Sequence, residues 1–321
     1  MHVMVLGAAG MIGRKLVAAI VAGGLDATAL TLVDVVAPDA PAGFAGRLRC
    51  LALDLGEDGV AERLVGLRPD LILHLAAVVS GEAERDFDKG YRANLDGTRA
   101  LFEAIRRVGG YCPRVVFASS IVVFGAPFPQ RVGDTQLVAP MTSYGTQKAV
   151  SELLLEDYSR RGMLDGVALR LPTICIRPGA PNKAASGFFS NILREPLLGR
   201  PAVLPVGDGL RHWFASPRAA VGFFLHAARM DTGDLGHRRA VTLPGVSATV
   251  GEMVEALRDV AGNDAVALIR REPDEAIAAI VAGWPGDFEA TRARALGFRA
   301  EADFAEIIRV FIEDDLPAAE H

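Results

Sequence analysis

The chain has 321 residues, half of them hydrophobic and 23% charged, a composition typical of a well-packed enzyme with one large or two interlocked domains. Its net charge is −5 and its basic residues form no blocks, so neither nucleic acid nor an anionic membrane is expected as a partner. Any anionic ligand must therefore be held by locally placed basic groups.

The three cysteines, Cys50, Cys112 and Cys175, lie far apart and lack the spacing of a metal site or a redox motif. We expect reduced thiols packed as small hydrophobic residues, and no metal. The apolar N-terminus lacks a basic start and a cleavage site, and no apolar run reaches the roughly 18 residues that span a bilayer. These features predict a cytoplasmic protein.

Short, nearly continuous apolar runs alternate with longer helical patterns through the first half of the chain. Such runs are typical of strands that helices cover on both faces. The expected strands begin at His2, Ala29, Arg49, Leu71, Arg114 and Gly166. The expected helices cover residues 10–23, 60–67, 91–108 and 143–162. This alternation predicts an α/β fold with a doubly wound parallel sheet of the Rossmann type.

The pattern changes after Pro172, where glycine and proline become frequent and the helical stretches shorten. We expect residues 1–172, with a return segment at roughly 213–245, to form a dinucleotide-binding domain. Residues 173–212 and 246–321 are expected to form a smaller C-terminal substrate-binding domain that is interleaved with the first.

A glycine motif, GAAGMIG, follows the first strand and opens the first helix, with Gly7, Gly10 and Gly13 as its glycines. This context favours a dinucleotide site over a glycine turn without a ligand, because the glycines let a pyrophosphate approach the helix N-terminus. Asp34 ends the second strand, 21 residues beyond Gly13, where it can accept hydrogen bonds from the adenosine ribose. Its charge repels a 2′-phosphate and two valines follow it, so NAD is favoured over NADP.

Two further strand ends face the same expected site. Asp54 closes the third strand, where it can either meet the adenine amino group or cap the next helix. Ala76 and Ala77 follow the fourth strand, and their small side chains let a cofactor lie against the strand end. His74, just before them, is expected to be a buried packing residue.

Tyr144 and Lys148 lie four residues apart on a predicted helix and therefore project from one face. A free phenol has a pKa of about 10 and is a poor base at neutral pH. A neighbouring ammonium and a positive nicotinamide ring lower that pKa, so Tyr144 can take a proton from a substrate hydroxyl while hydride leaves for the nicotinamide. We expect Lys148 also to hold the nicotinamide ribose, and Ser120, after the fifth strand, to hydrogen-bond the reacting oxygen.

Together these motifs resemble those of the extended short-chain dehydrogenases, the NAD-dependent epimerase/dehydratase superfamily. The matching segments are GAAGMIG, Asp34, HLAA, NLDGT, SSIVVFG, SYGTQK and RLPTICIRPG, and they span nearly the whole chain. The resemblance implies an NAD cofactor and adds Asn94, Pro172 and Thr173 to its contacts. The complete set of expected cofactor residues is Gly7, Gly10, Met11, Ile12, Gly13, Asp34, Asp54, Leu55, Ala76, Ala77, Asn94, Tyr144, Lys148, Pro172 and Thr173.

Within the superfamily the residues favour oxidation over other reactions. Dehydratases carry an Asp–Glu pair where this chain has Ile121 and Val122, which have no proton to exchange. Nucleotide-sugar epimerases carry an acidic stretch where this chain has SPR at 216–218. The whole-chain resemblance to sugar-acid dehydrogenases implies NAD-dependent oxidation of the C2 hydroxyl of a small sugar acid, D-erythronate. The alternatives are an NAD-dependent nucleotide-sugar epimerase and, more remotely, a non-catalytic NAD-binding sensor.

A small sugar acid needs a guanidinium or several donors for its carboxylate. Arg211 is the first candidate for this partner, and the expected substrate contacts are Ser80, Ser120, Asn182, Ser186 and Arg211. Arg177 and Arg194 are expected to form surface or interdomain ion pairs instead. Helices at 91–108 and 142–161 have apolar positions on more than one face, and relatives of this type dimerise through such helices, so we expect a homodimer.

Overall fold

The computed structural model describes residues 1–179 and 186–316, which belong to two compact units. The first unit consists of Met1–Val123, Pro140–Leu171 and Val221–Thr242. The second consists of Phe124–Ala139, Pro172–Ala220 and Leu243–His321. These units are defined by packing, whereas the expected dinucleotide-binding and substrate-binding domains are defined by their ligands. The limits of the expected domains therefore stay a prediction.

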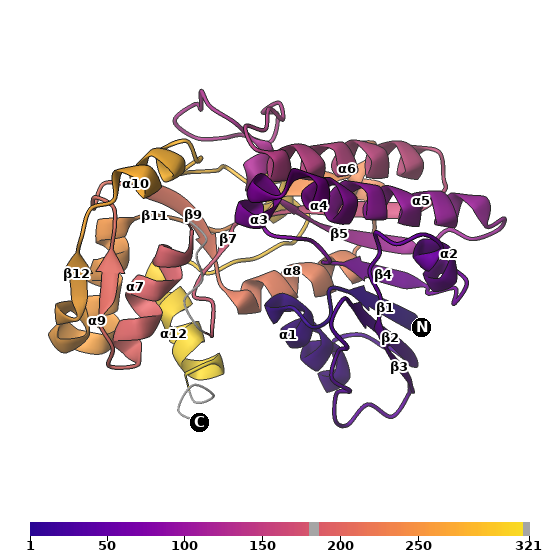
Figure 1. Ribbon diagram of the computed structural model, residues 1–321, viewed down its shortest axis with the longest axis horizontal. Coiled ribbons are helices and arrows are strands. Elements are labelled where there is room, and N and C mark those ends of the chain that lie inside the picture. Colours follow the sequence, from indigo (N-terminus) through magenta and orange to yellow (C-terminus); the bar gives the residue numbers. More distant parts are fainter. Residues whose placement is uncertain (180–185, 317–321) are drawn as a thin grey trace. The chain divides into compact units, whose positions relative to one another are not determined.

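A seven-stranded sheet forms the centre of the first unit, in the order β10-β6-β5-β4-β1-β2-β3 (Figure 1). Its strands are β1 (His2–Leu6), β2 (Ala29–Asp34), β3 (Arg47–Ala52), β4 (Leu71–His74), β5 (Arg114–Ser120), β6 (Asp165–Leu171) and β10 (Ala240–Thr242). All neighbouring strands are parallel. The first six have the Rossmann order, so the predicted fold is confirmed. Ligands of such sheets bind at the carboxyl ends of the strands, where the order reverses between β1 and β4.

Helices cover both faces of this sheet. They are α1 (Met11–Ala19), α2 (Val60–Val65), α3 (Ser80–Arg85), α4 (Phe87–Gly90), α5 (Gly97–Arg107), α6 (Ser143–Arg160) and α8 (Pro217–Arg229), whose first residues belong to the second unit. Figure 1 shows α5 and α6 side by side on one face and α1 on the other. Leu101, Phe102 and Ile105 of α5 are fully buried against the sheet, whereas Leu153 of α6 is 59% exposed. The homodimer through these helices stays a prediction.

Several elements begin or end a few residues from their expected limits, and two of these differences bear on the site. The third strand ends at Ala52, two residues earlier than expected, so Asp54 lies in the following turn. The helix expected over residues 91–108 is the last part of a longer helical segment that starts with α4 and passes through a wider turn at Tyr91–Asp96 before α5. Strand and helix ends depend on pairing and capping, which periodicity does not specify.

The second unit is built from smaller pieces. A three-stranded sheet joins β7 (Thr173–Ile174), β9 (Arg211–Ala215) and β11 (Val246–Thr249), and β8 (Ala202–Leu204) pairs with β12 (Ile269–Arg271). The helices are α7 (Gly187–Leu197), α9 (Val250–Ala267), α10 (Glu275–Ala282), α11 (Thr291–Ala295) and α12 (Phe304–Asp314). Buried aromatic residues such as Phe189, Phe214 and Phe311 share one hydrophobic core there.

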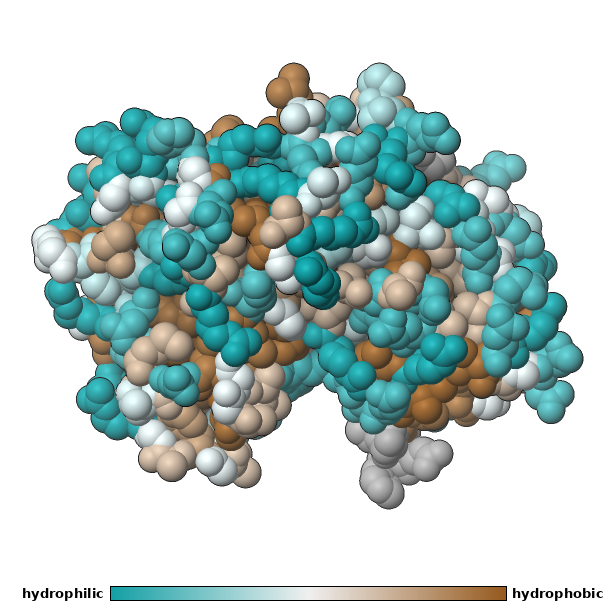
Figure 2. All heavy atoms as spheres, turned by 180° about the vertical axis from the view of Figure 1, so that it is seen from behind, coloured by the Kyte–Doolittle hydropathy of each residue, from teal (hydrophilic) through white to brown (hydrophobic). Residues whose placement is uncertain are grey.

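Among the residues that the structure describes, no helix is long and apolar enough to cross a bilayer. Hydrophilic residues cover most of the face shown in Figure 2, and hydrophobic residues form small groups between them. The same described residues contain no cluster of three or more His, Cys, Asp or Glu side chains arranged to hold a metal. The three cysteines are free thiols.

Candidate active site

The glycine motif forms a tight loop between β1 and α1. Gly7 has a φ of +87°, and the Gly10 N–H donates to the Gly7 carbonyl at 3.2 Å. A Cβ on Gly13 would lie 2.1 Å from that carbonyl oxygen, so a side chain there would collide with the turn. No side chain caps the first N–H groups of α1, and its first turn holds no acid. Free N–H groups and the helix dipole suit an anion, so this loop fits the pyrophosphate of a dinucleotide.

Two acids predicted to meet the adenosine have different surroundings. One carboxylate oxygen of Asp34 accepts from the Ala9 N–H at 2.9 Å, which ties the end of β2 to the glycine loop. Asp54 accepts from the Gly56 N–H at 2.8 Å and closes a turn. Since α2 begins at Val60, the alternative that Asp54 caps this helix is wrong. Asp34 thus lies beside the loop, where its prediction requires it.

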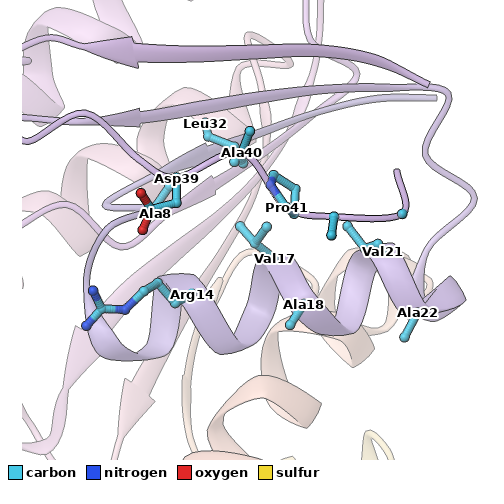
Figure 3. Close-up of a pocket in the computed structure, with 12 residues that line it drawn as sticks. Ala8, Arg14, Val17, Ala18, Val21, Ala22, Leu32, Asp39, Ala40 and Pro41 are labelled. Atoms are coloured by element: carbon cyan, nitrogen blue, oxygen red, sulfur yellow. The ribbon is translucent and has the colours of Figure 1, made fainter. Parts of the chain in front are cut away.

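A pocket of about 550 Å³ lies beside α1 and was not predicted from the sequence (Figure 3). Arg14 and Asp39 lie at the end of the pocket next to Ala8, whereas small aliphatic side chains such as Val17 and Pro41 line the rest. The segment at residues 39–43 forms one wall. This segment belongs to no predicted helix or strand, so the hydrophobic pattern of the sequence could not predict the pocket.

Asn94 holds the segment that follows β4. It is 1% exposed, and its carboxamide accepts from the Val78 N–H at 2.8 Å and donates to the Gln147 side chain at 2.7 Å. A Cβ on Gly7 would lie 2.7 Å from the Ala76 nitrogen, so this segment passes directly against the glycine loop. The carboxamide of Asn94 is therefore engaged within the protein, and it fixes the alanines that are predicted to line the cofactor.

The three expected catalytic residues come together where β5 meets α6. The side chain of Thr142 caps α6 by accepting from the Gly145 N–H at 3.1 Å. A Cβ on Gly145 would lie 2.4 Å from the Val122 carbonyl oxygen, so the first turn of α6 packs directly on the turn after Ser120. This contact brings Ser120, at the end of β5, beside the turn of α6 that carries Tyr144.

Lys148 is almost fully buried, one turn along α6 from Tyr144. Its Nζ lies 5.6 Å from the centre of the Tyr144 ring and 4.6 Å from that of Phe117. Burial lowers the pKa of Lys148 to about 7, although the Glu152 carboxylate raises it. Burial raises the pKa of Tyr144 to about 12. The phenol by itself is therefore a weak acid, and positive charge close to it is needed to make it a base.

His74 is buried behind this site, as expected. Thr98 donates its hydroxyl to the Asn94 carbonyl at 2.9 Å, so its oxygen accepts from the His74 Nε2 at 3.0 Å. The other ring nitrogen, Nδ1, has no partner among the described residues. Burial and, to a smaller extent, Lys148 lower the pKa of His74 to about 3. The imidazole is therefore neutral at physiological pH.

The expected substrate residues are dispersed. Arg211 begins β9, and its half-exposed guanidinium contacts the Ser247 hydroxyl at 3.3 Å and the Glu252 carboxylate at 3.2 Å. Ser80 begins α3, and Ser186 immediately precedes α7. Asn182 lies outside the described residues. Their roles stay predictions.

Two other arginines of the second unit differ from each other. Arg194 pairs with Glu195 at 2.8 Å, but this pair is buried and lies within α7, so the expectation of a surface or interdomain ion pair is wrong. Arg177 donates to the Ser186 hydroxyl at 2.9 Å, and no carboxylate of the described residues pairs with it. Burial lowers the pKa of Arg177, although Cys175 raises it and Arg194 lowers it by a smaller amount. A desolvated guanidinium without a carboxylate is suited to bind one.

The residues after β6 take part in the packing of the second unit. The Thr173 hydroxyl contacts the His212 Nε2 at 2.6 Å, and His212 stacks on Phe189. The Trp213 indole donates to the Leu243 carbonyl at 3.2 Å. Both ring residues are buried, so they form part of the core. The predicted cofactor contacts of Pro172 and Thr173 stay predictions.

A buried ionic cluster behind α6 was missed from the sequence. It consists of Ser119, Glu152 and Arg170, each at most 9% exposed. Two sequence features indicate part of it: Glu152 follows Lys148 by one helical turn, and Arg170 lies within the apolar run GVALRL. Neither feature identifies Ser119 as the third member.

Known proteins resemble this chain over its full length. The family model described as "NAD dependent epimerase/dehydratase family" matches residues 3–237. Curated proteins named D-erythronate dehydrogenase are similar: that of Cupriavidus necator is 46% identical over 98% of both chains, and that of Haemophilus influenzae is 42% identical over 98% of this chain and 100% of its own. A crystal structure of a protein named nucleoside-diphosphate-sugar epimerase, from Agrobacterium tumefaciens, is 62% identical with a TM-score of 0.97, covering 99% of this chain and 95% of its own.

Proposed function

The chain belongs to the NAD dependent epimerase/dehydratase family, as its motifs predicted, and on this premise we propose that it oxidises the C2 hydroxyl of D-erythronate to the 2-oxo acid. Its curated relatives also confirm the prediction of an NAD-dependent dehydrogenase. The observation that carries the proposed reaction is the buried Lys148, whose Nζ lies 5.6 Å from the ring of Tyr144.

In the proposed reaction Tyr144 removes the proton of the C2 hydroxyl. Ser120, half-buried at the end of β5, donates a hydrogen bond to the same oxygen and holds it near the phenol. When bound, NAD would accept the hydrogen of C2 with its electron pair, so that the products would be the 2-oxo acid, NADH and a proton. The oxygen keeps its bond to C2 throughout.

Lys148 has two tasks in this proposal. Its ammonium stabilises the phenolate of Tyr144 and so counteracts the burial that raises the pKa of the phenol. The ammonium would also donate a hydrogen bond to the nicotinamide ribose of bound NAD. Both tasks require the protonated lysine, because a neutral amine neither attracts the phenolate nor supplies as strong a donor.

Dehydration is not part of the proposal. The position after Ser120 is Ile121, which is 1% exposed, and the next is Val122. Neither side chain can give or take a proton, so a proton removed from carbon would have no acceptor at this place.

A nucleotide-sugar epimerase is the second candidate, favoured by the name of the solved protein from Agrobacterium tumefaciens. Epimerisation also uses a tyrosine base and NAD, but the hydride returns to the sugar and no NADH accumulates. Against this candidate stand the Ser216, Pro217 and Arg218 segment, which replaces the acidic stretch of epimerases, and the two curated dehydrogenases.

The substrate carboxylate needs a cationic partner, and two arginines are candidates. Arg211 was predicted from the sequence, and its guanidinium is already paired with Glu252. Arg177 is more deeply buried and has Ser186, a predicted substrate contact, as its partner. We propose that Arg177 shares this task with Arg211 and contributes the larger part of the binding, because no carboxylate of the described residues pairs with it.

The experiment is a panel assay with purified protein and NAD, in which NADH absorbance is followed. The panel contains D-erythronate, L-erythronate, D-threonate, L-threonine and a UDP-hexose. NADH formation with D-erythronate and not with the others supports the proposal. Isomerisation of the UDP-hexose without NADH formation from any acid would establish the epimerase instead.

A further inference from the structure

Behind the catalytic face of α6, Glu152 is held by donors from two neighbouring strands. Its Oε1 accepts from the Ser119 hydroxyl of β5 at 2.5 Å. Its Oε2 accepts from the Arg170 Nη2 of β6 at 2.7 Å, and the Arg170 Nε contacts both oxygens at 3.0 and 3.1 Å. The strands β5 and β6 pair in a register that sets Ser119 opposite Arg170. The carboxylate is thus fixed at a single place in the interior.

Donors from both strands satisfy the two carboxylate oxygens of Glu152, and the Arg170 guanidinium forms an ion pair with it at 2.7 Å. Glu152 follows Lys148 by four residues on α6, so the two side chains lie on the same face of the helix. The Glu152 side chain is 3% exposed and that of Arg170 is 11% exposed, so solvent screens neither charge strongly. A fixed negative charge therefore lies one helical turn beyond Lys148.

The groups around Lys148 come from several elements. His74 of β4 is neutral, Phe117 of β5 offers the face of its ring, and Tyr144 precedes Lys148 on α6. Glu152 is the group whose charge raises the pKa of the lysine, whereas Arg170 approaches the carboxylate from β6. The carboxylate is therefore the negative charge that offsets the burial of this ammonium.

We propose that Glu152, fixed by Ser119 and Arg170, is a positioning residue that keeps the buried Lys148 protonated in the pH range where the enzyme works. The inference rests on the roles proposed for Tyr144 and Lys148. Strands β5 and β6 fix the Glu152 carboxylate through Ser119 and Arg170. The carboxylate stabilises the protonated lysine, and the protonated lysine promotes ionisation of the tyrosine.

Removing the carboxylate then has a consequence that a loss of packing does not have. In Glu152→Gln the lysine loses its proton at lower pH, so the ammonium is present over a narrower range. The phenol of Tyr144 becomes harder to ionise wherever that ammonium is missing. The rate of oxidation should fall, and its rise with pH should move to higher pH.

The chain allows a direct test, because it contains only four lysines. Protein labelled with carbon-13 at the lysine ε-carbon gives few signals, and Lys148→Arg assigns the signal of Lys148. Titration of the free protein by NMR yields the pKa of Lys148 without any assay of activity. We expect Glu152→Gln to lower that pKa by about 1 pH unit, the lower end of the effect of an opposite charge nearby.

Three variants serve as controls. Glu156→Gln removes a carboxylate one turn further along α6, which accepts from the Arg239 and Ala240 N–H groups, and it should leave Lys148 unchanged. Glu152→Asp keeps the charge and should restore most of the pKa. If Arg170 without its partner prevents folding, the double variant Glu152→Gln with Arg170→Gln removes both charges and should lower the pKa as well.

If the pKa of Lys148 is unchanged both in Glu152→Gln and in the double variant with Arg170→Gln, the inference is overturned, even if the activity of these variants is low. A lowered pKa together with a shifted pH profile of kcat supports it. Because the titration uses the free protein, it decides this question even if D-erythronate proves not to be the substrate. The panel assay decides that second question separately.

Discussion

The two units of the chain use their polar residues differently. In the first unit the buried polar groups form connected sets at the ends of parallel strands: Asn94 with Gln147, His74 with Thr98, and Glu152 with Ser119 and Arg170. In the second unit the buried polar groups gather on α7 instead, where Arg194 donates to Glu195, Asn191 and the Arg177 carbonyl. Others hold helix ends, as Thr249 and Glu252 do at the start of α9. A repeated strand–helix architecture converges its strand ends on one place, whereas short pieces of sheet do not.

This difference determines what each unit contributes in our account. The first unit supplies chemistry that depends on tightly controlled charge, because Tyr144 and Lys148 have pKa values moved far by burial. The second unit holds the arginines proposed to bind the substrate carboxylate, and no carboxylate of the described residues pairs with Arg177. Substitutions in the first unit should therefore change kcat, and those in the second should change KM.

The largest expected effect is that of Tyr144→Phe, which removes the base. We expect kcat for D-erythronate to fall by roughly 10²- to 10⁴-fold, the range of a general base, while NAD binding measured by calorimetry is unchanged. Tyr158→Phe is the matched control, because Tyr158 lies on the same helix and its hydroxyl contacts Glu103. Equal losses in both variants would mean that the helix and not the phenol is at fault.

The second prediction concerns the arginines of the second unit. Arg177→Gln should raise KM for the sugar acid by about 10- to 100-fold with a small change in kcat, the size of a lost charge-assisted hydrogen bond. Arg211→Gln should have a smaller effect, because Glu252 already neutralises that guanidinium. If steady-state kinetics show a larger increase in KM for Arg211→Gln than for Arg177→Gln, Arg211 is the main partner of the substrate carboxylate.

Much of the first unit could be predicted from the sequence. Apolar runs gave the strands, and the glycine motif, Asp34, Ser120, Tyr144 and Lys148 lie at strand ends or on one helix face, where spacing alone brings them together. The cofactor contact of Asn94 stays a prediction, and the structure shows that its carboxamide holds Val78. Such a contact joins two loops, and the pattern of one segment cannot reveal it.

The remaining features depend on contacts between distant segments. The Glu152 cluster joins residues of α6, β5 and β6, and only the register of β5 with β6 sets Ser119 opposite Arg170. In the second unit the choice between Arg177, Arg194 and Arg211 depended on which of them had an acidic partner. Arg194 has Glu195 and Arg211 has Glu252, and neither pairing follows a periodic pattern.

The third prediction compares one buried histidine from each unit. Burial lowers the pKa of both His74 and His212 to about 3, so both are neutral when folded and take up protons on unfolding. Stability is then lost as the pH falls below the unfolded value of about 6.5, by about 2 kcal/mol for each histidine between pH 7 and pH 5.

Chemical denaturation at the two pH values measures this loss. His74→Gln and His212→Gln should each lose less unfolding free energy between the two pH values than the unmodified chain does. His237 is exposed, so His237→Gln should lose as much as the unmodified chain. If neither buried substitution reduces the loss, other groups cause the acid sensitivity.

The smallest expected effect concerns the choice of cofactor. Asp34→Asn removes the charge that would repel a 2′-phosphate and keeps an oxygen for the Ala9 N–H. The preference for NAD over NADP in kcat/KM should fall by about tenfold, which corresponds to about 1.4 kcal/mol. Asp54→Asn, in the turn after β3, should leave the preference unchanged. If both variants keep the preference for NAD over NADP, residues other than Asp34 and Asp54 cause it.

The central claim is that hydride leaves C2 of the sugar acid for NAD. It is tested most directly with D-erythronate deuterated at C2, purified protein and NAD, followed by mass spectrometry of both products. We expect deuterated NADH and an unlabelled 2-oxo acid in equal amounts. Unlabelled NADH with deuterium retained in the sugar acid product would show that oxidation occurs at another carbon and would contradict it.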